Sequence, residues 1–330
     1  MPSLALAQSL SLAPSPNRAG AAVSDNLDPS FAGFGIEPSN LFSFTGWNEP
    51  NEFSIQLLQN LADYAGAPPH IRVGGNTQDY MVYDPEYEDF GWKKNANSTA
   101  QGVIAADSMI IGPGYLRALD RFPKDTFITY GLNLAYEGSD YLDRMTTHAS
   151  GVVKELKNTR LYSFEIGNEP DLYLQNGMRT APWDGKVYTD EFMERADTVY
   201  QKVLKPNGMA PMFFEPPATA STIGTTFEIA MLNKNGILDQ MNGEYYVGWW
   251  NQHDYFYCTL SHPLRVFHML THRSHWCNPY PHHSRRPHGH GPDKHPVRVL
   301  GEAGQDRARH RRTLRSARNE LRRTYRYAPG

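Results

Sequence analysis

Hydrophobic runs alternate with amphipathic stretches between residues 31 and 257. Six of these runs are short, apolar, β-branched or aromatic, and bounded by Gly, Pro or Asn, which is typical of buried strands. The strands predicted from this pattern cover residues 31–37, 70–74, 126–133, 161–166, 211–215 and 244–250. Apolar positions at helical spacing predict helices between them, at residues 52–64, 114–121, 139–156, 190–204 and 225–233.

The repeated alternation of strand and helix indicates an α/β fold with a parallel sheet. An open doubly wound sheet and a (β/α)8 barrel both fit this order of elements. The glycine-rich phosphate-binding motifs of nucleotide folds are absent from the sequence. Barrel enzymes build their sites at the carboxyl ends of several strands, and polar residues follow the predicted strands here: Glu37, Asn76, Asn168, Glu169, Glu215 and His253. We therefore predict a TIM barrel body over residues 29–257.

Charge separates the end of the chain from this body. Residues 259–330 carry 15 basic and four acidic residues, a balance of +11, whereas the first 258 residues have a balance of −14. The tail also holds ten of the 13 histidines. Flexible His-rich tracts bind metals weakly, and basic helices attract phosphates. The histidine spacing fits no ordered metal site, however, and the acidic body opposes nucleic-acid binding. We predict no metal, no cofactor, no nucleic-acid partner and a monomeric protein.

Several features bear on where the protein acts. Residues 1–28 are rich in Ala, Ser and Pro, and residues 4–13 resemble the apolar part of a signal peptide, although no Lys or Arg precedes them. Asn97-Ser98-Thr99 is an N-glycosylation sequon. No apolar run reaches the roughly 18 residues that a membrane-spanning helix needs. These features predict a secreted protein without a membrane span, preceded by a disordered segment or a degenerate signal at residues 1–28.

The segment from Phe164 to Asp171 carries the clearest chemical signal. A buried strand delivers Asn168 and Glu169 to its carboxyl end, and Pro170 ends the strand by removing a ladder donor. Glycoside hydrolysis requires two carboxyl groups, of which one protonates the leaving oxygen and the other attacks the sugar or activates water. Glu169 is therefore a candidate acid/base, and the amide of Asn168 can hold a sugar hydroxyl. The alternative for Glu169 is a structural ion pair.

Two other features were weighed for the same chemistry. A first Asn-Glu-Pro copy at residues 48–50 follows a polar segment, and we interpret it as a helix start with Pro50 near the first helical position. Among the aromatic residues, Trp183 is a candidate sugar subsite because it follows the acid/base strand. Trp249 and Trp250 belong to a strand whose residues mostly form core, although one of them could reach the mouth of the barrel.

Four motifs in chain order resemble a known enzyme family. They are Ile36-Glu37-Pro38, Arg72-Val73-Gly74-Gly75-Asn76-Thr77-Gln78-Asp79, the segment from Glu165 to Asp171, and Asn251-Gln252-His253-Asp254-Tyr255. Together they resemble family 79 of the glycoside hydrolases, the β-glucuronidase and heparanase group, and look most like its fungal members. The resemblance covers about residues 29–257 and an island around Leu300-Gly301-Glu302. It implies a retaining hydrolase of clan A that cleaves β-linked glucuronic acid in a carbohydrate substrate.

The resemblance also implies roles for individual residues. Glu169 matches the acid/base of the family, and Glu302 matches its nucleophile at the end of a short apolar strand. Asp79 is expected to secure the loop that holds Asn76. The residues expected to bind the sugar or to orient the nucleophile are Glu37, Asn76, Asn168, His253 and Tyr255.

The chain departs from this family after residue 257. Residues 259–296 show no helical or strand period, and residues 305–330 are mostly Arg and Ala. We therefore expect a barrel that is incomplete at its C-terminal end, a seventh strand at residues 297–302 within a basic tail at 258–330, and no C-terminal β-sandwich. Glu215 is the next nucleophile candidate after Glu302. The alternative function is a truncated, catalytically inactive relic that binds carbohydrate at most weakly.

Overall fold

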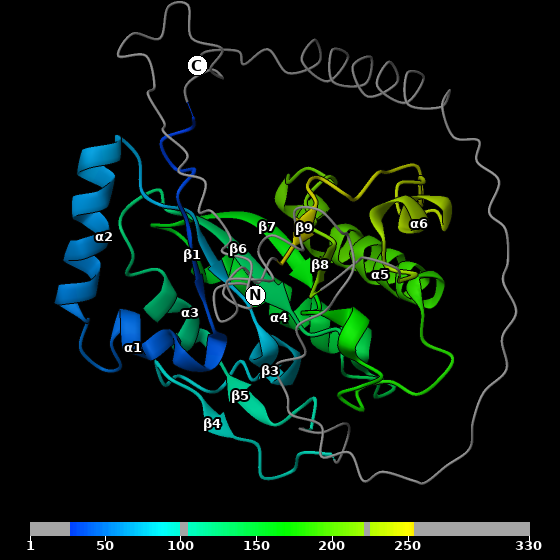
Figure 1. Cartoon of the computed structure of the whole chain (residues 1–330). Coiled ribbons are helices and arrows are strands. Elements are labelled where there is room, and N and C mark those ends of the chain that lie inside the picture. The colour runs from blue at the N-terminus through cyan, green and yellow to red at the C-terminus, as the bar shows by residue number, and fades with distance from the viewer. Residues whose placement is uncertain (1–26, 100–104, 221–224, 254–330) are drawn as a thin grey trace, which may run out of the picture. The chain divides into compact units, whose positions relative to one another are not determined.

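The computed structural model describes residues 27–99, 105–220 and 225–253. A parallel sheet lies at its centre (Figure 1), with strand order β1-β2-β6-β7. These strands match the first four predicted segments, and β7 begins one residue before its predicted start at 161. They are β1 (Phe34–Ile36), β2 (Ile71–Val73), β6 (Phe127–Leu132) and β7 (Arg160–Ile166). Each strand pairs with the next predicted strand along the chain, as right-handed strand–helix–strand units require.

The fifth and sixth predicted strands extend the parallel sheet through single β-bridges. Phe164 of β7 bridges to Phe214, and Phe214 bridges to Val247, both in parallel. Beyond them, β8 (Pro217–Thr219) pairs in parallel with β9 (Asn251–Gln252). The predicted α/β fold with a parallel sheet is therefore confirmed. Within the described residues the parallel sheet does not close into a barrel, and the expected seventh strand lies outside them.

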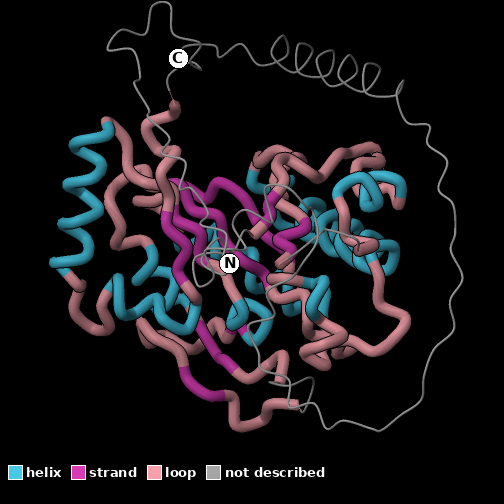
Figure 2. Tube along the Cα trace, viewed as in Figure 1, coloured by secondary structure: helices cyan, strands magenta, loops and turns pink. Residues whose placement is uncertain are grey.

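The predicted helices are all present. The α-helices are α1 (Leu41–Thr45), α2 (Glu52–Ala65), α3 (Pro113–Leu119), α4 (Tyr141–Glu155), α5 (Gly185–Val199) and α6 (Ile229–Lys234). A π-helical turn at Tyr200–Leu204 extends α5, so the predicted end of that helix is reached, as the tube in Figure 2 shows. Short 3-10 turns lie at Pro38–Asn40, Asn76–Tyr80, Pro170–Leu172 and Lys205–Asn207.

Helix starts follow from capping residues. The side chain of Asp184 accepts hydrogen bonds from the backbone N–H groups of Lys186 and Val187, so α5 begins five residues earlier than the predicted start at 190. The side chain of Asn51 caps α2 by accepting from the N–H of Ser54. Pro50 therefore precedes the cap, and the prediction that placed it near the first helical position was wrong by this margin.

The two faces of the sheet differ in polarity. The face toward α4 and α5 is mainly apolar, and its centre is buried, with Ile128, Tyr130, Leu132, Phe164 and Ile166. On the opposite face, alternate residues are polar, because side chains along a strand point to opposite sides. These polar residues are Arg72, Thr129, Ser163 and Glu165, and Ser163 and Glu165 have no exposed surface. The polar face is the one that carries the strand-end residues predicted for the site.

A second sheet was not predicted from the sequence. Its order is β3 (Met81–Tyr83), β5 (Met109–Ile111) and β4 (Lys93–Lys94), with β3 parallel and β4 antiparallel to β5. Strands of two or three residues are too short to show a period of two. This sheet packs on α4 through β3 and carries the chain from β2 to α3.

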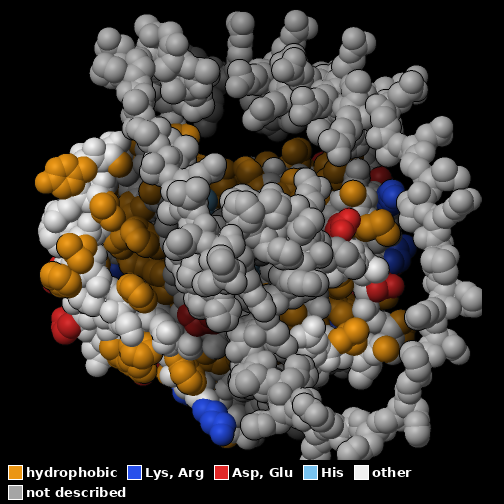
Figure 3. All heavy atoms as spheres, in the orientation of Figure 1, with side chains coloured by type: hydrophobic (Ala, Val, Ile, Leu, Met, Phe, Trp, Pro, Cys, Tyr) orange, Lys and Arg blue, Asp and Glu red, His pale blue; other side chains and the backbone are white. Residues whose placement is uncertain are grey.

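Helix α2 exposes a large part of its apolar surface at one side of the molecule (Figures 1 and 3). Phe53 and Tyr64 are 74% and 91% exposed, and Leu57 and Leu61 lie between them on the same helix. Among α2 residues, only Ala62 is buried. Neither α2 nor any other helix in the described ranges has the length and hydropathy needed to cross a membrane.

Phe164→Ala should lower the free energy of unfolding by about 3–5 kcal/mol, because Phe164 has no exposed surface and its ring packs against Phe213 and Phe214. Chemical denaturation followed by tryptophan fluorescence measures the change. The matched control is Phe53→Ala, whose side chain is 74% exposed and whose loss should cost about 0.5 kcal/mol or less. Equal losses in the two variants would contradict the assignment of Phe164 to the core.

Candidate active site

The end of β7 places Asn168 and Glu169 in an unusual backbone conformation. Gly167 has a φ of +82° and Glu169 has a φ of +50°, so the chain turns twice through the left-handed region within three residues. Glycine adopts that region readily, whereas a residue with a side chain does so at a cost of about 1–2 kcal/mol. The N–H of Glu169 donates to the carbonyl of Ala218 at 2.9 Å, which ties the turn to the start of the next strand pair. Both residues are buried.

Asn168 is held from three directions. Its Nδ2 donates to Oδ1 of Asn76 at 3.0 Å, and its Oδ1 accepts from Nη2 of Arg72 at 2.9 Å. Its backbone N–H donates to Oδ2 of Asp79 at 2.9 Å. All three partners come from β2 or from the turn that follows it, so the ends of β2 and β7 meet at this point as predicted.

His253 contacts Glu169 directly. Nδ1 of His253 lies 2.9 Å from Oε1 of Glu169, and both side chains are mostly buried. The other ring nitrogen, Nε2, is buried without a hydrogen-bond partner among the described residues. Unpaired buried polar atoms are rare in proteins and are often functional. The structure therefore joins the strand ends that carry Asn76, Glu169 and His253.

Glu37 lies at the same end of the sheet. Its Oε1 accepts from the N–H of Thr77 at 2.6 Å and from the Thr77 hydroxyl at 2.5 Å. The two glycines after β2 make this approach possible. A Cβ atom at Gly75 would lie 2.3 Å from a carboxylate oxygen of Glu37, and one at Gly74 would lie 2.6 Å from Nε of Arg72.

A buried ion pair lies directly below these residues. Nε of Arg72 donates to Oε2 of Glu165 at 3.0 Å, and Nη2 of Arg72 donates to Oε1. Nδ2 of Asn251 donates to Oε2 of the same carboxylate at 2.6 Å. Burial opposes the charge of Arg72, but the carboxylates of Glu165, Glu37 and Glu169 raise its pKa. Arg72 thus provides a permanent positive charge beneath the candidate acid/base.

Sequence reasoning missed the roles of Arg72, Glu165 and Asn251, although a signal was present. An acidic residue within an otherwise buried strand almost always has a partner of opposite charge. Arg72 also lies inside one of the motifs on which the resemblance was based.

Asp79 is fully buried and collects four hydrogen bonds. Its Oδ1 accepts from the N–H groups of Leu134 and Ala135, at 2.9 and 3.3 Å, and its Oδ2 accepts from the N–H of Asn168 and the hydroxyl of Tyr173, at 2.9 and 2.6 Å. Burial raises the pKa of Asp79 to about 6, while the four donors act in the opposite direction.

Two residues predicted near the site lie elsewhere. The carboxylate of Glu215 accepts from the hydroxyls of Ser163 and Thr129, and Ser163 lies six residues before Glu169 in the chain. Burial raises the pKa of Glu215. Trp183 is 6% exposed and its Nε1 donates to the carbonyl of Pro170 at 2.7 Å, so it belongs to the core.

The first Asn-Glu-Pro copy is remote from this cluster. It forms part of the loop before α2, where Arg121 donates to the carbonyls of Thr45, Gly46, Trp47 and Asn48. Tyr255 and Glu302, the remaining predicted site residues, lie outside the described residues. Over the described ranges, no group of three or more metal-binding side chains is present.

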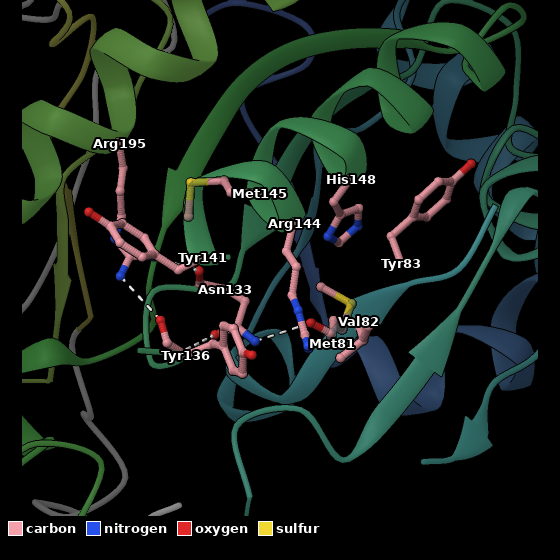
Figure 4. A pocket seen from close by; sticks show the side chains of 10 residues that line it. All are labelled: Met81, Val82, Tyr83, Asn133, Tyr136, Tyr141, Arg144, Met145, His148 and Arg195. Carbon is pink, nitrogen blue, oxygen red and sulfur yellow. Dashed lines mark hydrogen bonds between the residues drawn. The ribbon is translucent and has the colours of Figure 1, made fainter. Parts of the chain in front are cut away.

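A separate pocket lies between β3, α4 and α5 (Figure 4). The guanidinium of Arg144 lies 4.1 Å from the centroid of the Tyr136 ring, and that of Arg195 lies 4.4 Å from the Tyr141 ring. Burial lowers the pKa of His148 to about 3, so this histidine is neutral at ordinary pH. None of the residues predicted for the site lines this pocket.

Comparisons with known proteins agree with the resemblance seen in the sequence. The chain is 36% identical over 182 residues to a β-glucuronidase of Aspergillus niger and 30% identical over 189 residues to a β-glucuronidase of Neurospora crassa. These matches cover 53% and 54% of this chain but only 32% and 33% of the relatives, so the chain spans about a third of their length. The relationship to fungal β-glucuronidases is therefore confirmed at the level of sequence.

The comparison of structures gives a weaker match. A 4-O-α-L-rhamnosyl-β-D-glucuronidase from Fusarium oxysporum aligns over 69% of this chain and 45% of its own, with 20% identity and a TM-score of 0.49. No family model matches the chain.

Arg72→Met should lower the free energy of unfolding by about 3–5 kcal/mol, because it leaves the Glu165 carboxylate buried and without its cation. The control is Arg160→Met, which removes an ion pair with Asp125 whose side chains are 61% and 46% exposed. That loss should be about 1 kcal/mol or less. Urea denaturation measures both, and a small loss in Arg72→Met would show that Glu165 finds another partner.

The stability of the protein should depend on the pH through Asp79. Between pH 4 and 6 the folded state keeps a proton on Asp79 that the unfolded state has lost, so the free energy of unfolding falls as the pH rises through this window. Between pH 3.5 and 7, the free energy of unfolding of the parent should fall by about 3 kcal/mol relative to that of Asp79→Asn. Denaturation at several pH values measures the difference. If the parent instead gained stability over Asp79→Asn as the pH rose, the four donors would lower the pKa of Asp79 by more than burial raises it.

Proposed function

We propose that the protein is a retaining glycoside hydrolase that cleaves β-linked glucuronic acid by double displacement. The observation that carries this proposal is the contact of Asn168 and Glu169, at the end of β7, with Asn76 and His253 from two other strand ends. The names of the two sequence relatives support the choice of glucuronic acid as the sugar. We extend the proposal to a (β/α)8 barrel and to a secreted monomer that acts on carbohydrate.

In this mechanism Glu169 protonates the leaving oxygen and later removes a proton from the attacking water. A general acid of this kind must hold its proton until the glycosidic bond breaks. Glu169 is buried, and its carboxyl group lies within one hydrogen bond of the His253 ring. Asn168 would bind the 2-hydroxyl of the sugar through its amide, whose orientation Arg72 and Asn76 fix from both ends. Glu37 and Asn76 would bind further sugar hydroxyls.

The proposed nucleophile is Glu302, with Tyr255 beside it in the subsite that holds the sugar. Its carboxylate attacks the anomeric carbon and displaces the aglycone, which takes the proton from Glu169. Water activated by Glu169 then attacks the anomeric carbon, breaks its bond to Glu302, and restores the free carboxylate of Glu302. A retaining mechanism requires the two carboxyl groups to lie about 5–5.5 Å apart.

The direct test is hydrolysis by the purified full chain of an aryl β-glucuronide, set beside a panel of other aryl β-glycosides. Release of the aryl alcohol from the glucuronide alone, with retention of anomeric configuration by NMR, is the expected result. Activity on a neutral glycoside and not on the glucuronide would overturn the choice of sugar. Absence of any hydrolysis by folded protein would favour the inactive relic.

Glu169→Gln should lose about 10²–10⁴-fold in kcat/KM on a glucuronide with a poor leaving group, because that aglycone depends on protonation. An activated aryl glucuronide should be affected much less, and added azide should partly restore its turnover. Glu302→Gln should abolish turnover on both. The matched control is Glu86→Gln, which changes an exposed carboxylate and should leave both rates unchanged. Near-parent activity of Glu302→Gln would show that the nucleophile is another residue.

A further inference from the structure

Asp79 connects three segments that would otherwise be independent. It lies in the turn after β2, and its carboxylate accepts from backbone N–H groups after β6 and after β7. These are the carboxyl ends of three adjacent strands. The fourth donor, the Tyr173 hydroxyl, comes from the segment that follows Glu169. Thus Oδ2 of Asp79 binds the chain on both sides of Glu169 in sequence.

The turn that Asp79 holds contains a strained residue. Glu169 has a φ of +50°, and the residue before it donates its N–H to Asp79. A single strained residue keeps its conformation only if its neighbours fix the backbone on each side. Asp79 holds the peptide between Gly167 and Asn168, and the carbonyl of Ala218 accepts the N–H of Glu169 itself. On the other side, the carbonyl of Glu169 accepts from the N–H of Leu172 at 2.9 Å.

We propose that Asp79 is a positioning residue for catalysis, which holds the strained turn so that the Glu169 carboxyl faces the glycosidic oxygen. This inference rests on the proposed function of Glu169. Asp79 is fully buried, so it acts through the backbone of Asn168 and makes no contact with substrate. A displacement of about 1 Å in a catalytic group can cost on the order of 10²-fold in rate.

Asp79→Asn removes this function while keeping the size of the side chain. A carboxylate accepts on both oxygens, whereas an amide accepts on one atom and donates from the other. In either amide orientation, one pair of donors would face an NH2 group: Leu134 and Ala135, or Asn168 and Tyr173. The orientation that keeps the backbone pair after β6 releases Asn168, and with it the turn.

Asp120, the residue that ends α3, offers a control at the opposite end of β7. Its Oδ1 accepts from the N–H groups of Lys157, Asn158 and Thr159, in the loop that precedes β7. Asp120 and Asp79 therefore hold the two ends of β7 by the same kind of bond. Because Asp120 is only half-buried, Asp120→Asn should destabilise the fold less than Asp79→Asn, and it should leave the geometry of Glu169 unchanged.

The experiment compares kcat/KM for a 4-nitrophenyl and an alkyl β-glucuronide in the parent, Glu169→Gln, Asp79→Asn and Asp120→Asn, at a temperature where each is folded by circular dichroism. In Asp79→Asn we expect a loss at least tenfold greater for the alkyl substrate, as in Glu169→Gln. In Asp120→Asn any loss should be equal for both substrates. An equal loss in Asp79→Asn would overturn the proposal and leave Asp79 a purely structural residue.

If Asp79→Asn does not fold, Tyr173→Phe decides the question. This variant removes one donor from Oδ2 of Asp79 and keeps the buried ring. We expect Tyr173→Phe to lose less kcat/KM than Asp79→Asn would, with a greater loss on the alkyl than on the 4-nitrophenyl glucuronide. An equal loss of kcat/KM on both substrates would again overturn the proposal. Failure of the proposed function looks different: the parent would not hydrolyse either glucuronide, or Glu169→Gln would show no leaving-group dependence.

Discussion

The ion pair between Arg72 and Glu165 constrains the rest of the structure. The two residues belong to β2 and β7, which are separated in the sheet by β6, and their side chains meet on its polar face. Taking two charges out of water is costly unless each satisfies the other, so neither strand can change its place alone. The pair also supports the site, because the same guanidinium donates to Asn168 and faces the carboxylates of Glu37 and Glu169.

The same pair fixes the register of the sheet. Arg72 lies between Ile71 and Val73, which have no exposed surface on the apolar face. A shift of one residue would exchange the two faces, placing a guanidinium among the helix-facing apolar side chains and an isoleucine beside Glu165. The polar residues at the strand ends are therefore aligned by a contact that lies below them in the sheet.

The sequence predicted the repeating part of the fold well, because buried strands and amphipathic helices have local patterns. The fifth predicted strand is present only as single bridges at Phe214. Pro211, Pro216 and Pro217, which lie in or beside this segment, lack the N–H donors that a longer ladder needs. Partners across the chain were harder to predict. Asp79 binds groups 55 to 94 residues away, and nothing in its own segment specifies them. Spacing identified Asn76, Asn168, Glu169 and His253 as strand-end residues that meet. Glu215 was also expected at a strand end, but its carboxylate binds the Ser163 hydroxyl, six residues before Glu169, and spacing alone does not indicate this contact.

The backbone of Glu169 has a consequence for how this protein could change. At a φ of +50°, glycine would be the easier residue, and glutamate is disfavoured by about 1–2 kcal/mol. Selection for stability alone would therefore tend to replace Glu169, while selection for acid/base chemistry would keep it. A chain that had lost its activity would be free to take the more stable residue. The acid/base role proposed for Glu169 would therefore be maintained at a conformational cost of about 1–2 kcal/mol, which a glycine at this position would largely avoid.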